Sequence, residues 1–188
     1  MSVGRAVLRT MIGGLFIGHG TQKLFGWFGG NGPEQTGGFF EKLGLRPGKR
    51  HALAAGAAET AGGAMLAVGL LTPFATATLS SVMITAIRKV HGKNGVWNSS
   101  GGFEYNAVLL AAFFVLAEQG PGSYSIDARA FPRLHGPALA VAQLACAAAA
   151  SELAQSDLIN QPVSEPEPGP GDITGDGTPT ADLVSIAA

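Results

Sequence analysis

The sequence predicts an all-α integral membrane protein: a four-helix bundle with a candidate fifth helix near the C-terminus and a disordered tail. Charged residues make up 13% of the 188-residue chain, about half the share that is usual in soluble domains. Glycine is abundant, with 28 residues, as it is in membrane helices that pack closely. Long stretches of the chain also lack any charge. The few ionisable residues within these stretches should therefore face the interior of the bundle.

The first apolar stretch covers residues 3–25 and predicts a membrane helix, because no small-residue cleavage site follows it as in a signal peptide. The stretch contains His19 and Lys23, which share one helix face because residues four apart are neighbours. Gly14 and Gly18 lie beside that face with small-xxx-small spacing. We expect these two glycines to let a second helix approach closely.

The next segments predict a loop followed by a helical hairpin. Residues 29–50 are rich in glycine, proline and charge, which is typical of a loop, with a short interfacial helix expected over 38–43. From residue 60 to residue 87 the chain has 28 consecutive uncharged residues. This run is too long for one core helix, and Pro73 interrupts it, so we expect two membrane helices joined by a tight turn at 71–73.

The rest of the chain predicts a fourth helix, a candidate fifth helix and a tail. Residues 105–117 form an apolar run, and so do residues 137–153, where the dominance of alanine makes membrane insertion marginal. The final segment is rich in Pro, Gly, Ser and Asp, which is typical of disorder. The chain thus divides into a four-helix transmembrane domain (1–128), a loop with a candidate fifth membrane helix (129–154) and an acidic tail (155–188).

A soluble helical bundle is the main alternative, because several charge-free runs are shorter than the roughly 20 residues that a membrane span needs. The second and third helices lack the polar face of a surface helix, which favours the membrane. With the helices as expected, the loops at one end hold seven Lys and Arg residues and those at the other end hold four. The positive-inside rule then predicts that the first loop is cytoplasmic.

Glu59 is the most informative single position, because an acidic residue within an apolar helix costs about 2.5 to 3.5 kcal/mol at mid-membrane unless it is paired or protonated. Its neighbours three and four residues away are all Ala or Gly, so another helix can pack over the carboxyl group. We expect Glu59 to meet His19 or Lys23. A proton-exchanging or ligand-binding carboxyl group and a structural tie between two helices are both compatible with this pattern.

His91 and Glu104 are further candidates at helix ends. His91 is compatible with a head-group pocket or with solvent, and Glu104 with a helix cap or with the polar cluster. No metal site is expected, because the four histidines have no ligand spacing and Cys146 is the single cysteine. No nucleic-acid surface is expected either, since the net charge is −1 and no basic stripe is present.

Four segments, taken in order, resemble the DoxX family of small integral membrane proteins: GHGTQKLFGWFGGNG, ETAGGAMLAVGLLTP, VMITAIRKVHGKNG and GGFEYNAVLLAAFFVLAEQGPGSYSID. Together they cover roughly residues 5–128. The resemblance implies a multi-pass, four-helix transmembrane bundle in the cell membrane. It also implies an intramembrane polar site, which would hold a quinone, at the matching positions His19, Lys23, Glu59, His91 and Glu104.

Relatives in that family have been tied to thiosulfate:quinone oxidoreductase, as its membrane subunit, and to complexes that handle thiols and oxidative stress. By resemblance, this chain is a membrane subunit of an oxidoreductase system. No intrinsic cofactor is expected, so electrons would come from a soluble redox or thiol-handling partner or from direct reaction of a thiol with quinone. A non-catalytic scaffold for soluble redox enzymes and a small-solute or proton-coupled transporter are the alternatives. Association with the lipid bilayer is expected, and formation of a homo-oligomer is compatible with the sequence.

Overall fold

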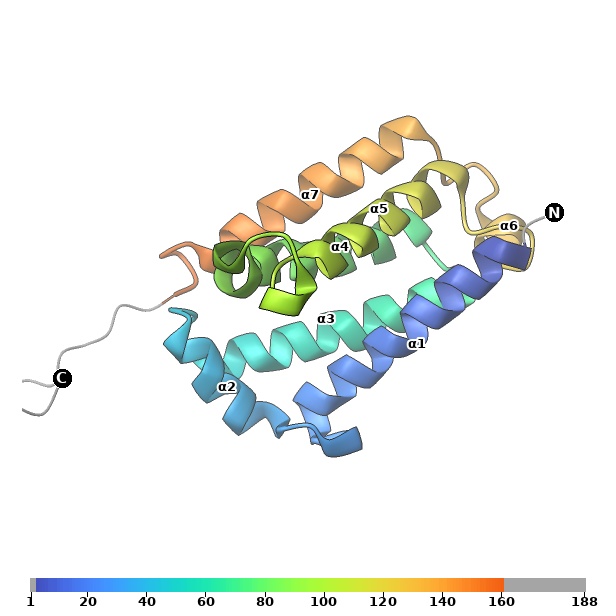
Figure 1. Cartoon of the computed structure of the whole chain (residues 1–188). Coiled ribbons are helices and arrows are strands. Elements are labelled where there is room, and N and C mark those ends of the chain that lie inside the picture. Colours follow the sequence, from blue (N-terminus) through green and yellow to red (C-terminus); the bar gives the residue numbers. More distant parts are fainter. Residues whose placement is uncertain (1–2, 161–188) are drawn as a thin grey trace, which may run out of the picture.

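The computed structural model describes residues 3–160, and this range contains helices and connecting turns but no strand. The all-α class is therefore confirmed. Five long helices run back and forth along one direction (Figure 1). They are α1 (Val3–Phe25), α3 (Gly48–Val68), α4 (Thr72–Ala86), α5 (Glu104–Gln119) and α7 (Pro137–Gln155). The shorter elements are η1 (Trp27–Gly29), α2 (Gly32–Lys42), η2 (Ile87–His91), η3 (Gly92–Asn94), η4 (Asn98–Ser100) and α6 (Asp127–Ala130).

The helices form two layers. In one layer, α1 and α2 pack against α3, and in the other, α4 packs against α5 and α7 (Figure 1). The layers are joined by the predicted tight turn between α3 and α4, where Gly69 (φ 66°) and Leu71 (φ 45°) take left-handed conformations. Phe16 of α1 contacts Phe113 of α5 between the layers, with ring centroids 5.8 Å apart. The hydrophobic core thus lies between the two layers.

The closest helix contact joins α1 to α3 through glycines other than the predicted pair. A Cβ atom on Gly63 would lie 2.6 Å from the carbonyl oxygen of Gly13, so only glycine fits there. Gly14 and Gly18 have open space around them, and the prediction that they make the close approach is wrong. The reason is that the bulky Phe16 shares its face with Gly13 and is buried, which turns Gly14 and Gly18 away from α3.

One end of the bundle, at the α3–α4 turn, is sealed by buried polar groups, and we call it the closed end. The carboxylate of Asp127, 2% exposed, accepts hydrogen bonds from the backbone N–H groups of Leu71 (2.7 Å) and Thr72 (2.8 Å) and from the Thr72 hydroxyl (2.7 Å). The guanidinium of Arg9 is also buried. It donates to the backbone carbonyls of Ala67, Pro121 and Tyr124. Neither Arg9 nor Asp127 stood out in the sequence as a buried group.

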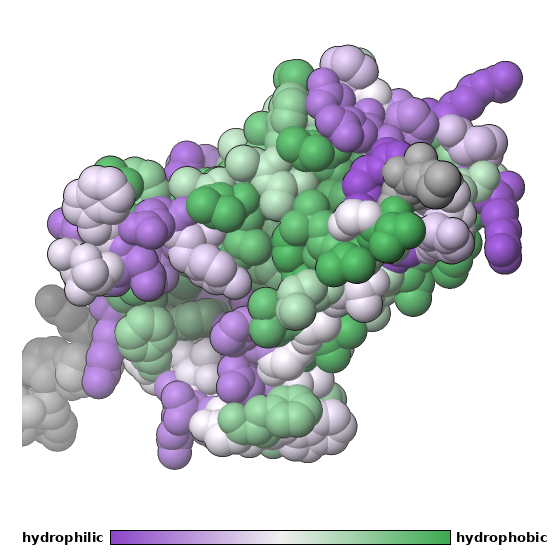
Figure 2. Space-filling model, turned by 45° about the vertical axis from the view of Figure 1, so that its right-hand side comes forward, coloured by the Kyte–Doolittle hydropathy of each residue, from purple (hydrophilic) through white to green (hydrophobic). Residues whose placement is uncertain are grey.

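The outer surface is largely apolar. Figure 2 shows hydrophobic side chains in a continuous band across the middle of one face, with hydrophilic ones gathered mostly toward the two ends. Among residues 3–160, α7 is the helix that is long and apolar enough to cross a membrane, with a mean hydropathy of 1.4. This is the helix whose insertion the sequence made marginal. The helices α4 and α5, with 15 and 16 residues, are shorter than the ~20 residues of a typical span.

Two boundaries differ from the predicted ones. The interfacial helix α2 begins at Gly32, six residues earlier than expected, because Pro33 is well suited to the first turn of a helix. At the C-terminal side, residues 155–160 are ordered, and the side-chain oxygen of Asn160 accepts a hydrogen bond from the backbone N–H of Arg46 at 2.8 Å. The rest of the predicted disordered tail, residues 161–188, lies outside the described residues.

Candidate functional site

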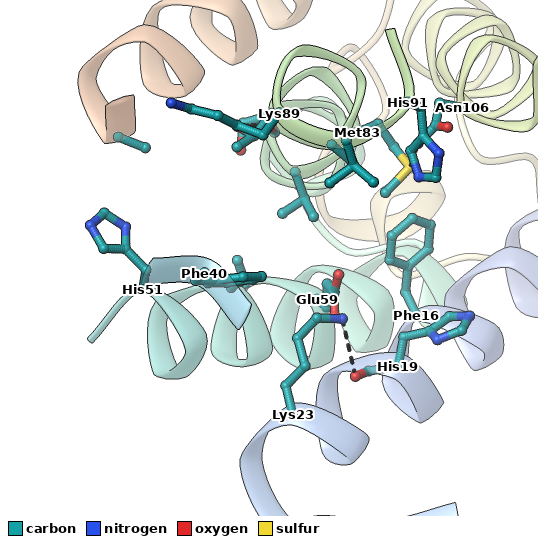
Figure 3. Close-up of a pocket in the computed structure, with 18 of the residues that line it drawn as sticks. Phe16, His19, Lys23, Phe40, His51, Glu59, Met83, Lys89, His91 and Asn106 are labelled. Atoms are coloured by element: carbon teal, nitrogen blue, oxygen red, sulfur yellow. Dashed lines mark hydrogen bonds and ion pairs between the residues drawn. The ribbon is translucent and has the colours of Figure 1, made fainter. Parts of the chain in front are cut away.

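A cavity of about 530 Å³ lies between the two layers, toward the end of the bundle opposite the closed end (Figure 3). Its volume is in the range of small-molecule sites. Most of the lining is apolar and comes from both layers, with Phe16 and Phe40 on one side and Met83 and Leu109 on the other. Several polar side chains also reach the lining. They are His19, Lys23, His51, Glu59, Ser81, Thr85, Lys89, His91, Asn98, Tyr105 and Asn106.

Glu59 and Lys23 form an ion pair in the cavity wall. The Glu59 Oε2 atom lies 2.6 Å from Lys23 Nζ, and the Glu59 side chain is 4% exposed against 23% for Lys23. Figure 3 shows the two side chains turned toward each other from α3 and α1. The small residues around Glu59 allow this contact because α1 comes close to α3. The sequence-based expectation that Glu59 meets the polar face of the first helix is confirmed for Lys23.

His19 lines the same cavity but makes no direct hydrogen bond to Glu59. Its Nδ1 atom lies 3.1 Å from the Gln22 side-chain oxygen. Its backbone carbonyl accepts a hydrogen bond of 3.4 Å from Lys23 Nζ. His19 is exposed, in contrast to the buried Glu59.

His91 also reaches the cavity, from the layer facing Glu59 (Figure 3). It ends η2, a π-helical turn that continues α4, and such turns are frequent at functional sites. His91 Nδ1 lies 2.8 Å from the backbone carbonyl of Gly101. A carbonyl oxygen only accepts hydrogen bonds, so Nδ1 carries a proton and the other nitrogen, Nε2, is a free acceptor in the neutral ring.

Glu104 is the one predicted site residue that does not line the cavity. It begins α5, and its Oε2 atom accepts a hydrogen bond of 2.9 Å from the backbone N–H of Asn98. The carboxylate therefore holds the loop before α5 in place. This bond to the preceding loop is neither of the two roles that the sequence left open, a cap of its own helix and membership of the polar cluster.

His51, Lys89 and Asn106 line the cavity but were not predicted from the sequence. His51 precedes Glu59 by eight residues, a spacing that puts both on one face of α3, and this periodicity is the signal that identifies it. Lys89 follows an apolar run at a helix end, where a cation usually marks the membrane boundary. Asn106 Nδ2 makes a weak hydrogen bond of 3.3 Å to the sulfur of Met83, which leaves its side-chain oxygen available to a ligand.

The arrangement suits an uncharged, mostly apolar molecule with a small polar head. The Lys23 ammonium is a donor and the Glu59 carboxylate is an acceptor, and the Nε2 atom of His91 lies on the facing side, where it accepts a hydrogen bond whenever the ring is neutral. The apolar walls would hold the remainder of such a molecule. Within residues 3–160, no group of three or more His, Cys, Asp or Glu side chains is arranged to hold a metal ion.

Comparisons with known proteins agree with the resemblance in the sequence. Residues 4–92 match the model of the DoxX family. An uncharacterized membrane protein of Mycobacterium tuberculosis, Rv3486, is 27% identical over 133 residues, which cover 65% of this chain and 78% of that protein. No solved structure is significantly similar to the chain. The matched residues 4–92 include most of the cavity's polar side chains, among them His19, Lys23, Glu59 and His91.

Proposed function

Because this chain belongs to the DoxX family and is a membrane protein, we propose that it crosses the cell membrane several times and binds a quinone in its cavity. We further propose that it is the membrane subunit of an oxidoreductase system for thiol or sulfur compounds. One observation carries most of the proposal: the Lys23–Glu59 ion pair opens into a cavity with apolar walls. Ionisable residues inside a membrane are costly, so they usually serve a function.

The polar groups of the cavity match both redox forms of a quinone. The Lys23 ammonium can donate a hydrogen bond to a quinone carbonyl, and the Glu59 carboxylate can accept one from a quinol hydroxyl. The free Nε2 atom of His91 can accept the second hydroxyl hydrogen. A quinone ring and the start of its tail would contact Phe16 and Met83, which border the same space.

The surface supports a membrane location for the cavity. Apolar side chains on the outer faces of the long helices are exposed, including Val7 and Met11 of α1, Val108 of α5 and Val141 of α7. Trp27, beyond the end of α1, is 55% exposed, as expected for an aromatic anchor at the membrane interface. We infer that all five long helices cross the bilayer, with the cation-rich cavity end on the cytoplasmic side.

The proposed reaction has a simple balance. Two thiols lose two electrons and two protons to give one disulfide, and the quinone takes up both to become a quinol. Glu59 and His91 are the groups that we expect to pass the protons. The thiols would be presented by a soluble redox or thiol-handling enzyme, since Cys146 is the single cysteine of the chain.

Binding of a short-chain menaquinone or ubiquinone analogue to the purified protein in lipid nanodiscs tests the proposal. We expect saturable binding that weakens at least tenfold for the quinone form in Lys23→Met and for the reduced, quinol form in Glu59→Gln, because each variant removes the charged partner of a hydrogen bond to that form. Glu152→Gln is the matched control, since Glu152 is an exposed acid paired with Arg88 outside the cavity. Unchanged affinity in both cavity variants would overturn the quinone site and favour a scaffold.

A further inference from the structure

The cavity has a second polar region, formed by His51 and Lys89, on the opposite side of Glu59 from His91 (Figure 3). His51 lies in the first turn of α3, eight residues before Glu59 and about 12 Å from it along the helix axis. Lys89 projects from η2 in the other layer. The proposed quinone head contacts the Lys23–Glu59 pair, so it leaves this second region unused.

The cavity opens to the exterior beside these two residues. Ala54 of α3 and Ala150 of α7 both line the cavity and are both exposed. His51 and Lys89 are only partly buried. We call this gap, bordered by the four residues, the α3–α7 opening. In a membrane-spanning bundle, an opening between two helices faces lipid.

The nitrogen atoms at the α3–α7 opening lack partners within the described part of the chain. His51 Nε2 is buried without a hydrogen bond. Lys89 forms no hydrogen bond or ion pair with residues 3–160. Within residues 3–160, the acidic side chains that form ion pairs do so with Lys23, Lys49 and Arg88, and none pairs with Lys89. The Lys89 ammonium is therefore a positive charge at the opening without a paired carboxylate in the described residues.

We propose that the α3–α7 opening binds the phosphate of an anionic phospholipid from the surrounding leaflet, with His51 and Lys89 as the phosphate ligands. The apolar side chains of Leu43 and Leu45 line the cavity on this side and would contact the first carbons of an acyl chain. Further cations, such as Arg50, follow the α2–α3 connection and favour an anionic over a zwitterionic lipid. Basic pockets between membrane helices recognise lipid head groups in this way.

Native mass spectrometry of the full-length protein, released from micelles doped with phosphatidylglycerol, tests this site. We expect one lipid to be retained, with affinity about fivefold lower in Lys89→Gln, because a lysine near a phosphate contributes about 1 kcal/mol, and lower again in the double variant with His51→Gln, which also removes the imidazole ligand. Lys89→Arg should restore binding. Lys93→Gln is the control, since Lys93 is an exposed cation of the same end that does not line the cavity.

Two further binding measurements identify the ligand. Equal retention of phosphatidylcholine would overturn recognition of an anionic head group, and displacement of the lipid by millimolar inorganic phosphate would show a free-anion site in place of a lipid site. Equal affinity in wild type, Lys89→Gln and the double variant would also overturn the proposal. Quinone binding by the same variants serves as a folding control, and it separates failure of this site from failure of the quinone site.

Discussion

The two ends of the bundle use buried charge in different ways. At the closed end, Asp127 and Arg9 direct their hydrogen bonds to backbone groups and to Thr72 within the protein. At the cavity end, Lys23 and Glu59 pair with each other at 2.6 Å but border open space. A buried polar group whose bonds are all made within the chain fixes the structure, whereas one with unused donors or acceptors can bind a ligand.

This difference separates groups that stabilise the fold from groups that are available for function, although both kinds are ionisable and buried. It also predicts opposite responses to mutation. Variants at the closed end should lower stability without a specific effect on binding. Variants at the cavity end should alter binding with little loss of stability.

Asp127→Ala should produce the largest effect. Loss of the carboxylate leaves two backbone N–H groups and the Thr72 hydroxyl without an acceptor, and we expect about 3 to 5 kcal/mol less free energy of unfolding. Thermal unfolding in detergent, followed by circular dichroism, measures this loss. Asp157→Ala is the control, since Asp157 is exposed and should change stability little. A loss below about 1 kcal/mol in Asp127→Ala would show that the closed end is not held by this carboxylate.

Gly13→Ala and Gly14→Ala form a matched pair for the α1–α3 contact that connects the two ends. A Cβ atom on Gly13 would lie 2.8 Å from the backbone nitrogen of Ala67, whereas one on Gly14 has nothing within 4 Å. We expect Gly13→Ala to cost about 1 to 3 kcal/mol through overpacking. Gly14→Ala should be neutral or stabilising by up to about 1 kcal/mol. If the same unfolding assay gave equal stabilities for the two variants, it would contradict the observed orientation of α1, in which Gly13 faces α3 and Gly14 does not.

Glu59→Gln should shift the unfolding free energy by only about 1 kcal/mol, since the amide oxygen still accepts a hydrogen bond from Lys23. The informative measurement is stabilisation by ligand. A quinol analogue at 100 times its dissociation constant should add about 2.7 kcal/mol to the wild-type protein and much less to Glu59→Gln. If Glu59→Gln lost most of the free energy of unfolding in the absence of ligand, Glu59 would be a structural group like Asp127. The proposed difference between a stabilising closed end and a ligand-binding cavity end would then be wrong.

Glu34→Gln should have the smallest effect, because Glu34 and Lys49 form an exposed ion pair at 2.5 Å. The hydrogen bond from Lys49 lowers the pKa of the Glu34 carboxyl group. A lowered pKa means that the stabilisation is present above the pKa of the unfolded chain and disappears as the pH falls through the folded-state value. We therefore expect a marginally lower melting temperature than wild type at pH 7 and no difference below the folded-state pKa. A large difference at either pH would be inconsistent with a solvent-screened pair.

The long helices and one half of the candidate site could be predicted from the sequence. Uninterrupted apolar runs require helices, and Pro73 required a break near the α3–α4 turn. The cost of placing Glu59 in an apolar helix required a partner, and Lys23 was among the few available. In each case a strong local energetic constraint left few alternatives.

The other features depend on tertiary geometry that local patterns do not encode. Gly13 and Gly14 differ by one residue, which is about 100° of helix rotation, and small residues occur on both faces of α1. Asp127 lies in a segment rich in glycine and proline that reads as a solvated loop, and its burial follows only once that segment folds over the start of α4. In the sequence, His51 and Lys89 look like the polar residues that commonly occur near helix ends. Their place in the lining is apparent only in the folded structure, because the cavity forms between the two layers.

The back-and-forth course of the long helices has a consequence for how the protein can be studied. Five passes are an odd number, so Val3 and Asn160 lie at opposite ends of the bundle (Figure 1). If every pass crosses the bilayer, reporter proteins fused before residue 3 and after residue 160 must occupy different compartments. A soluble enzyme tethered after Asn160 would then be delivered to the compartment that the cavity end of the protein faces.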